Sequence, residues 1–240
     1  MAMDFERSSS QWVDQGSDVP ATNGLSEASL AAWVKLESAA GTMGVISIAI
    51  GPPPGSSATS RFTMEIRSTR RVQVVVRAAD GGSSNTLLSA TALTLGVWTH
   101  IVVVVDIAND VFEIYIDGVL DASSSPSFTP TAWPSTNSKN AALGSKPDGS
   151  AEFLDGVLDD ARIYSVRLTA AEAQTLHAGR GKATVLRGLE QWYLLSEKEP
   201  GATASGAGTV KDGAVRQENA TPNASPVYAE SELSPRRRVG

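Results

Sequence analysis

The sequence predicts an all-β protein in which two antiparallel sheets pack into a sandwich, with one short helix and an extended C-terminal arm. Three observations predict this class. Short segments alternate apolar and polar residues at the period of a strand with one buried face. Glycine, proline and Asp-Gly turn signals separate these segments at short intervals. A single segment, near residue 170, has the start and stop signals of a helix.

The strands are predicted from their apolar patterns. Residues 62–66 alternate strictly, and Val72, Val74 and Val76 repeat the pattern against Gln73 and Arg77. Residues 97–106 are nearly all β-branched, as in a central strand. Gly156 lies inside the last predicted strand and indicates a bulge or a bend. The predicted strands are Leu30–Leu36, Val45–Ile50, Phe62–Ile66, Val72–Val76, Val97–Asp106, Val111–Asp117 and Phe153–Tyr164.

The connections between strands have the residues that turns require. Asp80-Gly81-Gly82 and Asp117-Gly118 are hairpin signals. Residues 51–55 read Gly-Pro-Pro-Pro-Gly and cannot continue a strand, because each proline lacks the donor that a sheet needs. Residues 123–138 contain three further prolines and are predicted to form a long loop.

The helix is predicted from its ends. Thr169 can cap the first turn, and Glu172, three residues later, can reach back to the backbone of Thr169. Residues 170–178 are good helix formers, and Gly179 is placed to end them. We therefore expect a helix of two to three turns.

Composition excludes several classes of function. Lys and Arg number 20 against 26 Asp and Glu, a net charge of −6, so most of the chain lacks the basic surface that binding to nucleic acid needs. Cysteine is absent and there are two histidines, which excludes disulfides, thiol chemistry and a multi-histidine metal centre. No apolar run is long enough to cross a membrane. The first residues are acidic and polar rather than leader-like, so we expect synthesis in the cytosol without a signal peptide.

Three motifs, taken in order, resemble the laminin-G-like, concanavalin A-like jelly-roll family. Trp98-Thr99-His100 is followed by Tyr115-Ile116-Asp117-Gly118, and residues 153–164 resemble the family's late strand. Residues 168–172 resemble its closing helix, and Trp33-Val34-Lys35 its early strand. The resemblance implies a jelly-roll domain over residues 1–181. Residues 182–240 then add one strand and an extended arm rich in Gly, Ser and Pro, which buries too little apolar surface to fold alone.

The residues of these motifs are interpreted as structural. Trp98 and His100 share one strand face, where we expect packing around a hydrogen-bonded imidazole. Asp159 and Arg162 are expected to form a partly buried pair or to bond backbone groups. The residues assigned to the fold in this way are Trp98, His100, Tyr115, Asp117, Gly118, Gly156, Asp159, Arg162, Thr169 and Glu172.

An enzyme is not expected. The glycoside hydrolases of this fold carry Glu-x-Asp-x-Glu on one strand, and here Tyr115 stands where the middle acid belongs, between Glu113 and Asp117. At the rise of a strand those two outer acids are roughly 13 Å apart. A retaining pair of carboxyl groups needs about 5–5.5 Å.

A carbohydrate-binding or calcium-binding module is the alternative that the residues leave open. Sugar-binding sandwiches present exposed aromatic rings, and Trp133, followed by Trp12, is the candidate platform. Burial of Trp133 at the edge of the sandwich is the competing interpretation. Asn109-Asp110 and Asp148-Gly149 could supply calcium oxygens, but no dense ligand run exists, and turn chemistry is favoured. No cofactor is therefore predicted.

The main expectation for function is a bacteriophage virion protein. The opening residues, the jelly-roll domain and the tail ending in Pro-Arg-Arg-Arg together resemble phage head-decoration or fibre-associated proteins. That resemblance implies a protein that decorates and stabilises a capsid exterior, with the major capsid protein or other virion proteins as partners and with a homo-oligomer left open. Arg236, Arg237 and Arg238 would then pair with carboxylates of a partner. No nucleic acid or membrane partner is expected.

Overall fold

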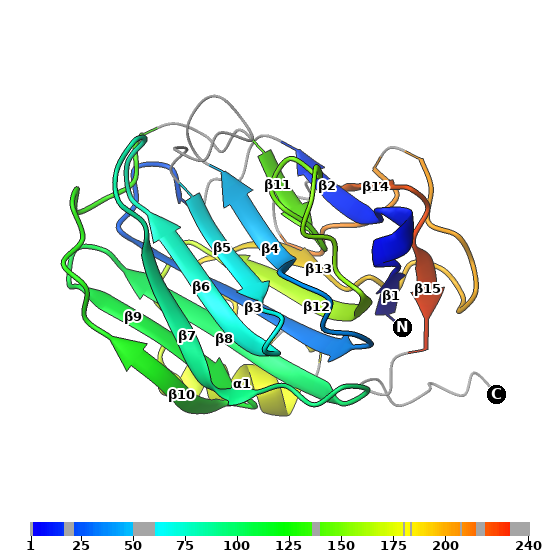
Figure 1. Ribbon diagram of the computed structural model, residues 1–240, viewed down its shortest axis with the longest axis horizontal. Helices are drawn as coiled ribbons and strands as arrows, with labels where there is room; N and C mark the ends of the chain where they lie inside the picture. The colour runs from blue at the N-terminus through cyan, green and yellow to red at the C-terminus, as the bar shows by residue number, and fades with distance from the viewer. Residues whose placement is uncertain are drawn as a thin grey trace.

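Two antiparallel sheets face each other in the computed structural model, which describes residues 2–16, 22–49, 61–135, 140–179, 181–182, 184–206, 208–214 and 219–230 (Figure 1). Within those residues sheet A has eight strands: β1 (Ala2–Phe5), β3 (Glu27–Leu36), β8 (Trp98–Asp106), β9 (Val111–Ile116), β10 (Val119–Ser124), β12 (Gly156–Tyr164), β13 (Leu189–Tyr193) and β15 (Val227–Ala229). Sheet B has seven: β2 (Trp12–Gly16), β4 (Met43–Ala49), β5 (Arg61–Ile66), β6 (Arg71–Arg77), β7 (Asn85–Ala92), β11 (Asn140–Leu143) and β14 (Thr221–Asn223). The predicted all-β sandwich is confirmed.

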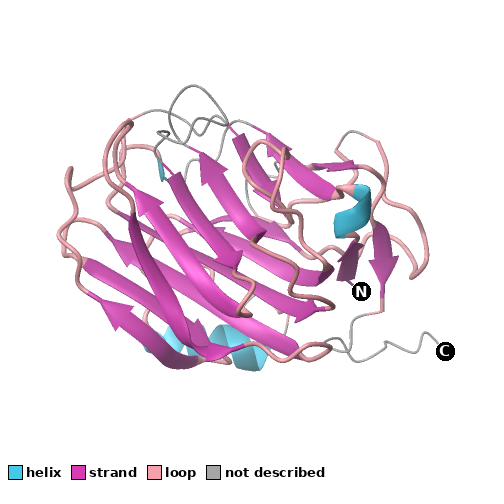
Figure 2. Ribbon diagram, in the orientation of Figure 1, coloured by secondary structure: helices cyan, strands magenta, loops and turns pink. Residues whose placement is uncertain are grey.

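The sheets follow different strand orders. Sheet A runs β10-β9-β8-β3-β12-β1-β15, with β13 paired to β12, and sheet B runs β14-β2-β11-β4-β5-β6-β7. Because each sheet combines strands from both ends of the chain, most of the fold depends on pairings that are distant in sequence. Figure 2 shows strands filling both layers, with the helices at the periphery.

The core lies between the sheets, and β8 shows how it is filled. Ile101, Val103 and Val105 point into the main core, whereas Val102 and Val104 point the other way, beneath the helix. A strand with apolar neighbours on both faces needs a continuous apolar run. This explains why residues 97–106 lack the usual polar alternation.

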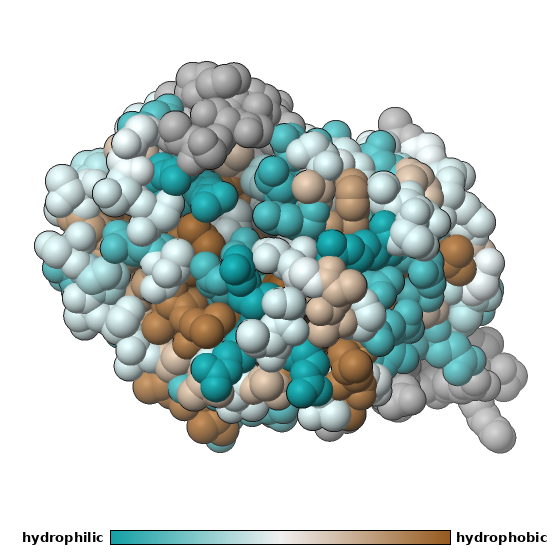
Figure 3. Space-filling model, viewed as in Figure 1, coloured by the Kyte–Doolittle hydropathy of each residue, from teal (hydrophilic) through white to brown (hydrophobic). Residues whose placement is uncertain are grey.

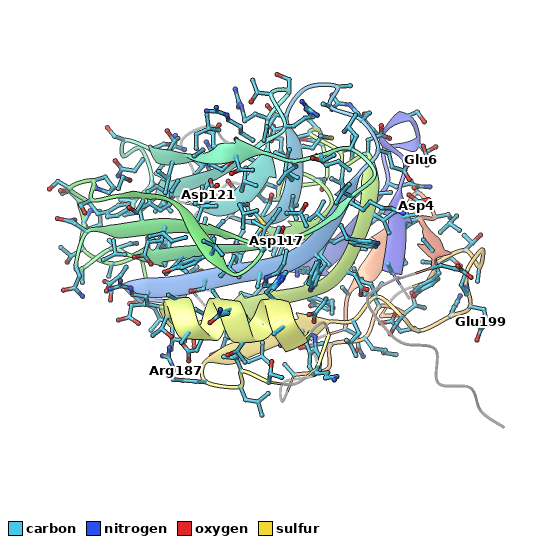
Figure 4. All side chains as sticks on the ribbon, turned by 90° about the horizontal axis from the view of Figure 1, so that it is seen from below. Asp4, Glu6, Asp117, Asp121, Arg187 and Glu199 are labelled. Atoms are coloured by element: carbon cyan, nitrogen blue, oxygen red, sulfur yellow. The ribbon has the colours of Figure 1, made fainter. Side chains whose placement is uncertain are left out.

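The helix α1 (Ala170–Gly179) begins with the predicted capping box. The backbone N–H of Thr169 donates to Glu172 Oε2 at 2.8 Å, and the N–H of Glu172 donates to Thr169 Oγ1 at 3.2 Å. Arg187 adds two hydrogen bonds to the same carboxylate, and these, ahead of the cap, lower the pKa of Glu172 to about 2. Figure 4 shows α1 against sheet A, with Asp117 and Arg187 on opposite sides of it.

Two predicted glycine positions are confirmed by backbone geometry. Asp117 and Gly118 both have positive φ, 50° and 78°, as the two-residue hairpin between β9 and β10 requires. Gly156 has φ of 148°, and a Cβ there would lie 2.4 Å from the carbonyl oxygen of Lys35. Glycine at this position therefore permits β12 to approach β3 closely.

The C-terminal segment differs from the predicted arm. The further strand expected within 185–195 is present as β13, which pairs with β12. Beyond it, β14 pairs with β2, and β15 pairs with β1. Tyr228 on β15 is 1 % exposed. The described part of 199–230 is therefore built into the sandwich. Its few apolar residues reach the core because its strands pair with β1 and β2. Arg236, Arg237 and Arg238 lie outside the described residues.

Among the residues that the structure describes, no helix has the length and apolar character needed to cross a bilayer.

Candidate functional site

The two outer faces of the sandwich differ in how they are covered. On sheet A, α1 packs over Val102, Val104 and Tyr115 and buries them with Leu168 and Leu176. On sheet B, no described helix or strand lies in front of the outer face (Figure 1). This face is accessible in part: Leu88 on β7 is 42 % exposed, whereas Ser47, Thr63 and Val75 on β4, β5 and β6 are 2 %, 3 % and 2 % exposed.

Beneath α1, motif residues of sheet A form a packed aromatic cluster. His100 is 2 % exposed, and its ring centroid lies 5.1 Å from Trp33 and 5.9 Å from His177 on the helix. Burial, then the charges of His177 and Arg162, lower the pKa of His100 to about 3. The expected hydrogen bond is not made by Nδ1, which has no partner among the described residues. Instead the backbone N–H of His100 donates to Asp117 Oδ1 at 2.8 Å.

Trp98 lies at the start of the same strand, beside a cation. The Nζ of Lys35, its neighbour on β3, lies 5.7 Å from the centroid of the Trp98 ring. This contact agrees with a structural role on the outer face of sheet A.

Arg162 pairs with Asp160 and not with Asp159, while both Asp159 and Arg162 bond backbone groups, as the other predicted interaction has it. Arg162 donates from Nε to Asp160 Oδ1 at 2.8 Å and from Nη2 to Asp160 Oδ2 at 3.0 Å. The pairing of β12 with β3 shifts register between Asp159 and Arg162, and Asp160 has φ of 51°. This bulge turns Asp160 toward Arg162, while the Asp159 carboxylate accepts the backbone N–H of Asp160.

Glu113 on β9 and Asp117 in the turn after it are held by separate contacts. The Tyr115 hydroxyl donates to Glu113 at 3.0 Å, and Arg167 also contacts that carboxylate at 3.3 Å. Burial, then the neighbouring Glu113, raises the pKa of Tyr115 to about 12. Asp117 instead accepts the backbone N–H of His100. Each of these two acids is therefore held by a different structural contact.

Trp133 is not an exposed platform. Its side chain is 2 % exposed, and its ring centroid lies 5.7 Å from that of Phe62 in the core. The loop that carries it folds inward, because the Trp133 backbone N–H donates to the carbonyl of Leu25 at 3.0 Å. An indole ring buries a large apolar area, and this burial favours the inward position of the loop.

Trp12 remains a candidate. It lies on β2 of sheet B, and since Val13 points into the core, Trp12 points outward. Its ring packs on the turn at Gly149, where a Cβ would come within 2.1 Å of the indole. One face of the ring is thus occupied by this turn, and the side chain is partly buried.

The positions considered for calcium are occupied by turn contacts. Asp106 accepts hydrogen bonds from the backbone and the side chain of Asn109. Asp110 accepts the backbone N–H of Phe128, and Asp148 accepts from Ser150. The interpretation as turn residues fits this geometry.

A different acidic group lies at the end of sheet A. Carboxylate oxygens of Asp4, Glu6 and Glu37 lie within 4.8 Å of one another, and Figure 4 places Asp4 and Glu6 at the end of the sandwich. Burial, then neighbouring acidic groups, raises the pKa values of Asp4 and Glu37. Oxygen ligands in this arrangement suit a hard cation such as calcium. Lys35 lies close enough to oppose part of that negative charge.

The outer face of sheet B carries a polar array on β5 and β6 that sequence reasoning missed. Arg61, Thr63 and Glu65 alternate with core residues on β5 and so point outward. Their cross-strand partners are Arg77, Val75 and Gln73 on β6. The central pair, Thr63 and Val75, is 3 % and 2 % exposed, whereas Arg61 and Arg77 are partly exposed. Figure 3 shows this face with hydrophilic and hydrophobic residues interspersed.

The β5–β6 hairpin is also strongly basic. Residues 61–77 contain five arginines and one glutamate, within a chain whose net charge is −6. The high density of arginine along the predicted hairpin is the sequence signal that could have indicated this site. The net negative charge of the whole chain concealed that signal.

Comparisons with known proteins agree on the fold. The family model described as the concanavalin A-like lectin/glucanases superfamily matches residues 8–174. Comparison with curated protein sequences finds no significant relative.

Three solved structures illustrate the likeness. A candidate carbohydrate-binding protein of Bacteroides ovatus has a TM-score of 0.63 at 16% identity, and the match covers 96% of this chain and 60% of that one. The CBM40 of the Ruminococcus gnavus IT-sialidase, bound to α2,3-sialyllactose, has a TM-score of 0.56 at 17% identity over 73% of this chain and 95% of that one. A heptameric SAP-like pentraxin of Limulus polyphemus has a TM-score of 0.55 at 14% identity over 78% and 85%. At these identities the likeness establishes the fold alone.

The expectation of a capsid-decorating virion protein gains no support from these comparisons. Two of the three similar structures are described by carbohydrate binding. The packed C-terminal segment also removes part of the argument for a partner-binding arm, since its described residues already have their partners within this chain.

Proposed function

Because this chain belongs to the concanavalin A-like lectin/glucanase superfamily, we propose that it is a non-enzymatic carbohydrate-binding protein whose ligand lies on the outer face of sheet B. The observation that carries the proposal is the contrast between the two faces. Sheet A is covered by α1, whereas the outer face of sheet B has polar side chains and no described helix or strand in front of it.

The chemistry of that face suits a saccharide. Gln73 and Glu65 face each other across β5 and β6, and Leu88 lies opposite Gln73 on β7, 42 % exposed. Sugars present hydroxyl groups that both donate and accept, together with apolar C–H patches. A face with amide, carboxylate and aliphatic groups side by side can satisfy both kinds of contact.

A purely binding function is favoured over catalysis. Hydrolysis of a glycoside needs two carboxyl groups set across one bond, at about 5–5.5 Å for retention or about 6.5–9.5 Å for inversion. On β5 and β6 Glu65 is the single acidic residue of this face; it pairs with Arg67 at 3.5 Å, and Glu152 reaches its neighbourhood from the loop after β11. Burial, then the charge of Glu152, raises the pKa of Glu65.

The proposal is tested with a broad glycan array, followed by calorimetry on each glycan that binds. The 3′-sialyllactose and lactose pair belongs on the array, since it compares an acidic with a neutral saccharide. We expect saturable binding that falls about tenfold when Gln73 and Leu88 are both changed to alanine. The matched control is Val119→Ala on sheet A, which is equally apolar and 68 % exposed.

Two results would contradict the proposal. An array on which nothing binds, with and without calcium, would overturn carbohydrate binding itself. Equal loss of affinity in the Gln73/Leu88 double variant and in Val119→Ala would place the ligand elsewhere than on the outer face of sheet B.

A further inference from the structure

Two arginines stand directly opposite each other on the outer face of sheet B. Arg61 on β5 and Arg77 on β6 are register partners, and both are partly buried. Like charges directly across a strand pair are destabilising. Burial, then the charge of Arg61, lowers the pKa of Arg77, which expresses the same repulsion. The pair therefore imposes a cost on the folded protein that an anion between the two guanidinium groups would relieve.

The polar atoms beside this pair lack partners. Arg61 Nε and Thr63 Oγ1 are buried, and neither has a hydrogen-bond partner within the part of the chain that the structure describes. Thr63 follows Arg61 on the same face, with 3 % of its surface exposed. Leaving buried polar groups unsatisfied is costly, and native proteins rarely do so without a reason.

The nearby carboxylates compensate the two arginines only in part: the charges of Arg61 and Arg67 both oppose the rise in the pKa of Glu65. Glu65 forms its ion pair with Arg67 at 3.5 Å, on the far side of Thr63 from Arg61. The charge of Asp80 acts on Arg77, so that arginine is partly compensated. Arg61 Nε and Thr63 Oγ1 therefore stay without hydrogen-bond partners among the described residues.

The donors define the chemistry of what would bind. Guanidinium groups have donors only, arranged in a planar fork that matches the oxygens of a carboxylate or a sulfate. A neutral hydroxyl would use one of these donors and leave the charge repulsion in place. The strongly basic hairpin, with five arginines and one glutamate in residues 61–77, adds a favourable field for an anion.

We propose that Arg61, Arg77 and the Thr63 hydroxyl form an oxyanion subsite that recognises the carboxylate or sulfate group of an acidic saccharide. This inference rests on the proposed function, because it specifies the class of glycan that the outer face of sheet B takes. The subsite orients the ligand, with the rest of the saccharide lying along β5 and β6 toward Gln73.

The test compares ligands that differ only in charge. Calorimetry would measure binding of trigalacturonate, of its neutral methyl ester and of a sulfated disaccharide. We expect the full-length protein to bind at least one of the two acidic ligands about tenfold more tightly than the methyl ester. That preference should weaken as NaCl is raised. Comparison of the carboxylated with the sulfated ligand identifies which oxyanion the subsite prefers.

Variants then assign the preference to these residues. Arg61→Met and Thr63→Val, both close in shape to the residues they replace, should each lower affinity for the acidic ligand about tenfold and leave that for the methyl ester unchanged. Arg70→Met is the matched control, because it removes the same charge from the exposed end of the hairpin. Arg61→Met should also raise the urea midpoint of the unliganded protein, since it removes the opposed charge.

The outcomes separate this inference from the proposed function. Equal affinity for the charged and neutral ligands, or equal losses in Arg61→Met and Arg70→Met, would overturn the oxyanion subsite while carbohydrate binding stands. An unchanged or lower urea midpoint in Arg61→Met would contradict the repulsion on which the argument depends. If neither charged nor neutral glycans bind, both the proposed function and the oxyanion subsite are wrong.

Discussion

Arg162 and Asp160 form a bidentate ion pair on the outer face of sheet A, with the two side chains 1 % and 2 % exposed. The pair sits in a larger network. Trp192 Nε1 donates to Asp160 Oδ1 at 2.6 Å, and its ring lies 4.6 Å from the Arg162 guanidinium. The backbone N–H of Gly181 donates to the other carboxylate oxygen, and Arg162 Nη2 donates to the carbonyl of Lys182. The pair thereby links β12 to β13 and to the segment after α1.

Breaking this pair should destabilise the protein strongly. Arg162→Met leaves a buried carboxylate without its cation, and we expect the free energy of unfolding to fall by about 3–5 kcal/mol. Asp160→Asn should cost a similar amount because it leaves Arg162 charged and buried. The double variant should lose clearly less than the sum of the two single losses, since neither charge remains. Urea unfolding of the four proteins measures this, and strictly additive losses would show that the two side chains act independently.

The buried histidine beneath α1 should make stability depend on pH. His100 faces Trp33 from β3, His177 from α1, Asp117 from the hairpin turn and Arg162 from β12. The folded protein keeps His100 neutral down to about pH 3, whereas the unfolded chain binds a proton near its ordinary pKa of 6.5. Between these values the unfolded state binds more protons, so stability is present above pH 6.5 and is lost as the pH falls.

The measurement compares urea unfolding of the wild type and of His100→Gln at pH 7 and pH 5. A single histidine of this kind should cost the wild type about 2 kcal/mol between pH 6.5 and pH 5, and the variant should lack that part of the slope. His177 and the carboxylates are present in both proteins and cancel in the comparison. Parallel pH profiles would indicate that His100 accepts a proton in the folded state.

Local signals in the sequence predicted local structure well. The two-sided apolar run of β8, the capping box at Thr169 and the hairpin at Asp117-Gly118 each depend on residues close together in the chain, and each is present as expected. The short strands β1, β2 and β11 were missed because four or five residues carry little periodicity. Their strand character comes from partners distant in sequence, such as the pairing of β1 with β12.

The same distinction separates the predicted site residues from the observed ones. A bulge within β12 decides that Asp160 rather than Asp159 meets Arg162, and no spacing rule indicates which of two adjacent acids will turn inward. Trp133 was the candidate platform because a proline-rich loop usually lies at the surface, and the structure supports the competing interpretation, burial of the ring. Arg61 and Arg77 face each other because of the register of β5 with β6. Every second register pair of these two strands lies on the outer face, and a shift of one residue would change every pair.

Trp133 should therefore affect stability and not glycan binding. Replacing this buried indole with alanine leaves a cavity against Phe62, and we expect a loss of about 3–5 kcal/mol. Trp133→Phe keeps much of the packing and should lose considerably less. Calorimetry on the folded Trp133→Phe protein should give the wild-type affinity for any glycan that binds. A selective loss of affinity at unchanged urea midpoint would restore Trp133 as a binding platform.

The C-terminal segment should be essential for folding. A chain that ends at residue 198 lacks β14 and β15, which removes a neighbour from β2 and from β1. It also uncovers core positions that Ala204, Val210, Ala220 and Tyr228 otherwise fill. Since a domain of this kind is stable by only about 5–15 kcal/mol in total, we expect the shortened chain to aggregate or to lose cooperative unfolding.

A chain that ends after Glu230 is the matched control for this truncation, because it keeps every described strand. It should show the size-exclusion profile, near-ultraviolet dichroism and urea midpoint of the full chain. If the protein that ends at residue 198 unfolds cooperatively at the same urea midpoint, the rest of the sandwich is stable without β14 and β15. If that protein unfolds cooperatively but is less stable, the difference in the free energy of unfolding measures what β14 and β15 contribute. A difference below about 1 kcal/mol would contradict their role in completing both sheets.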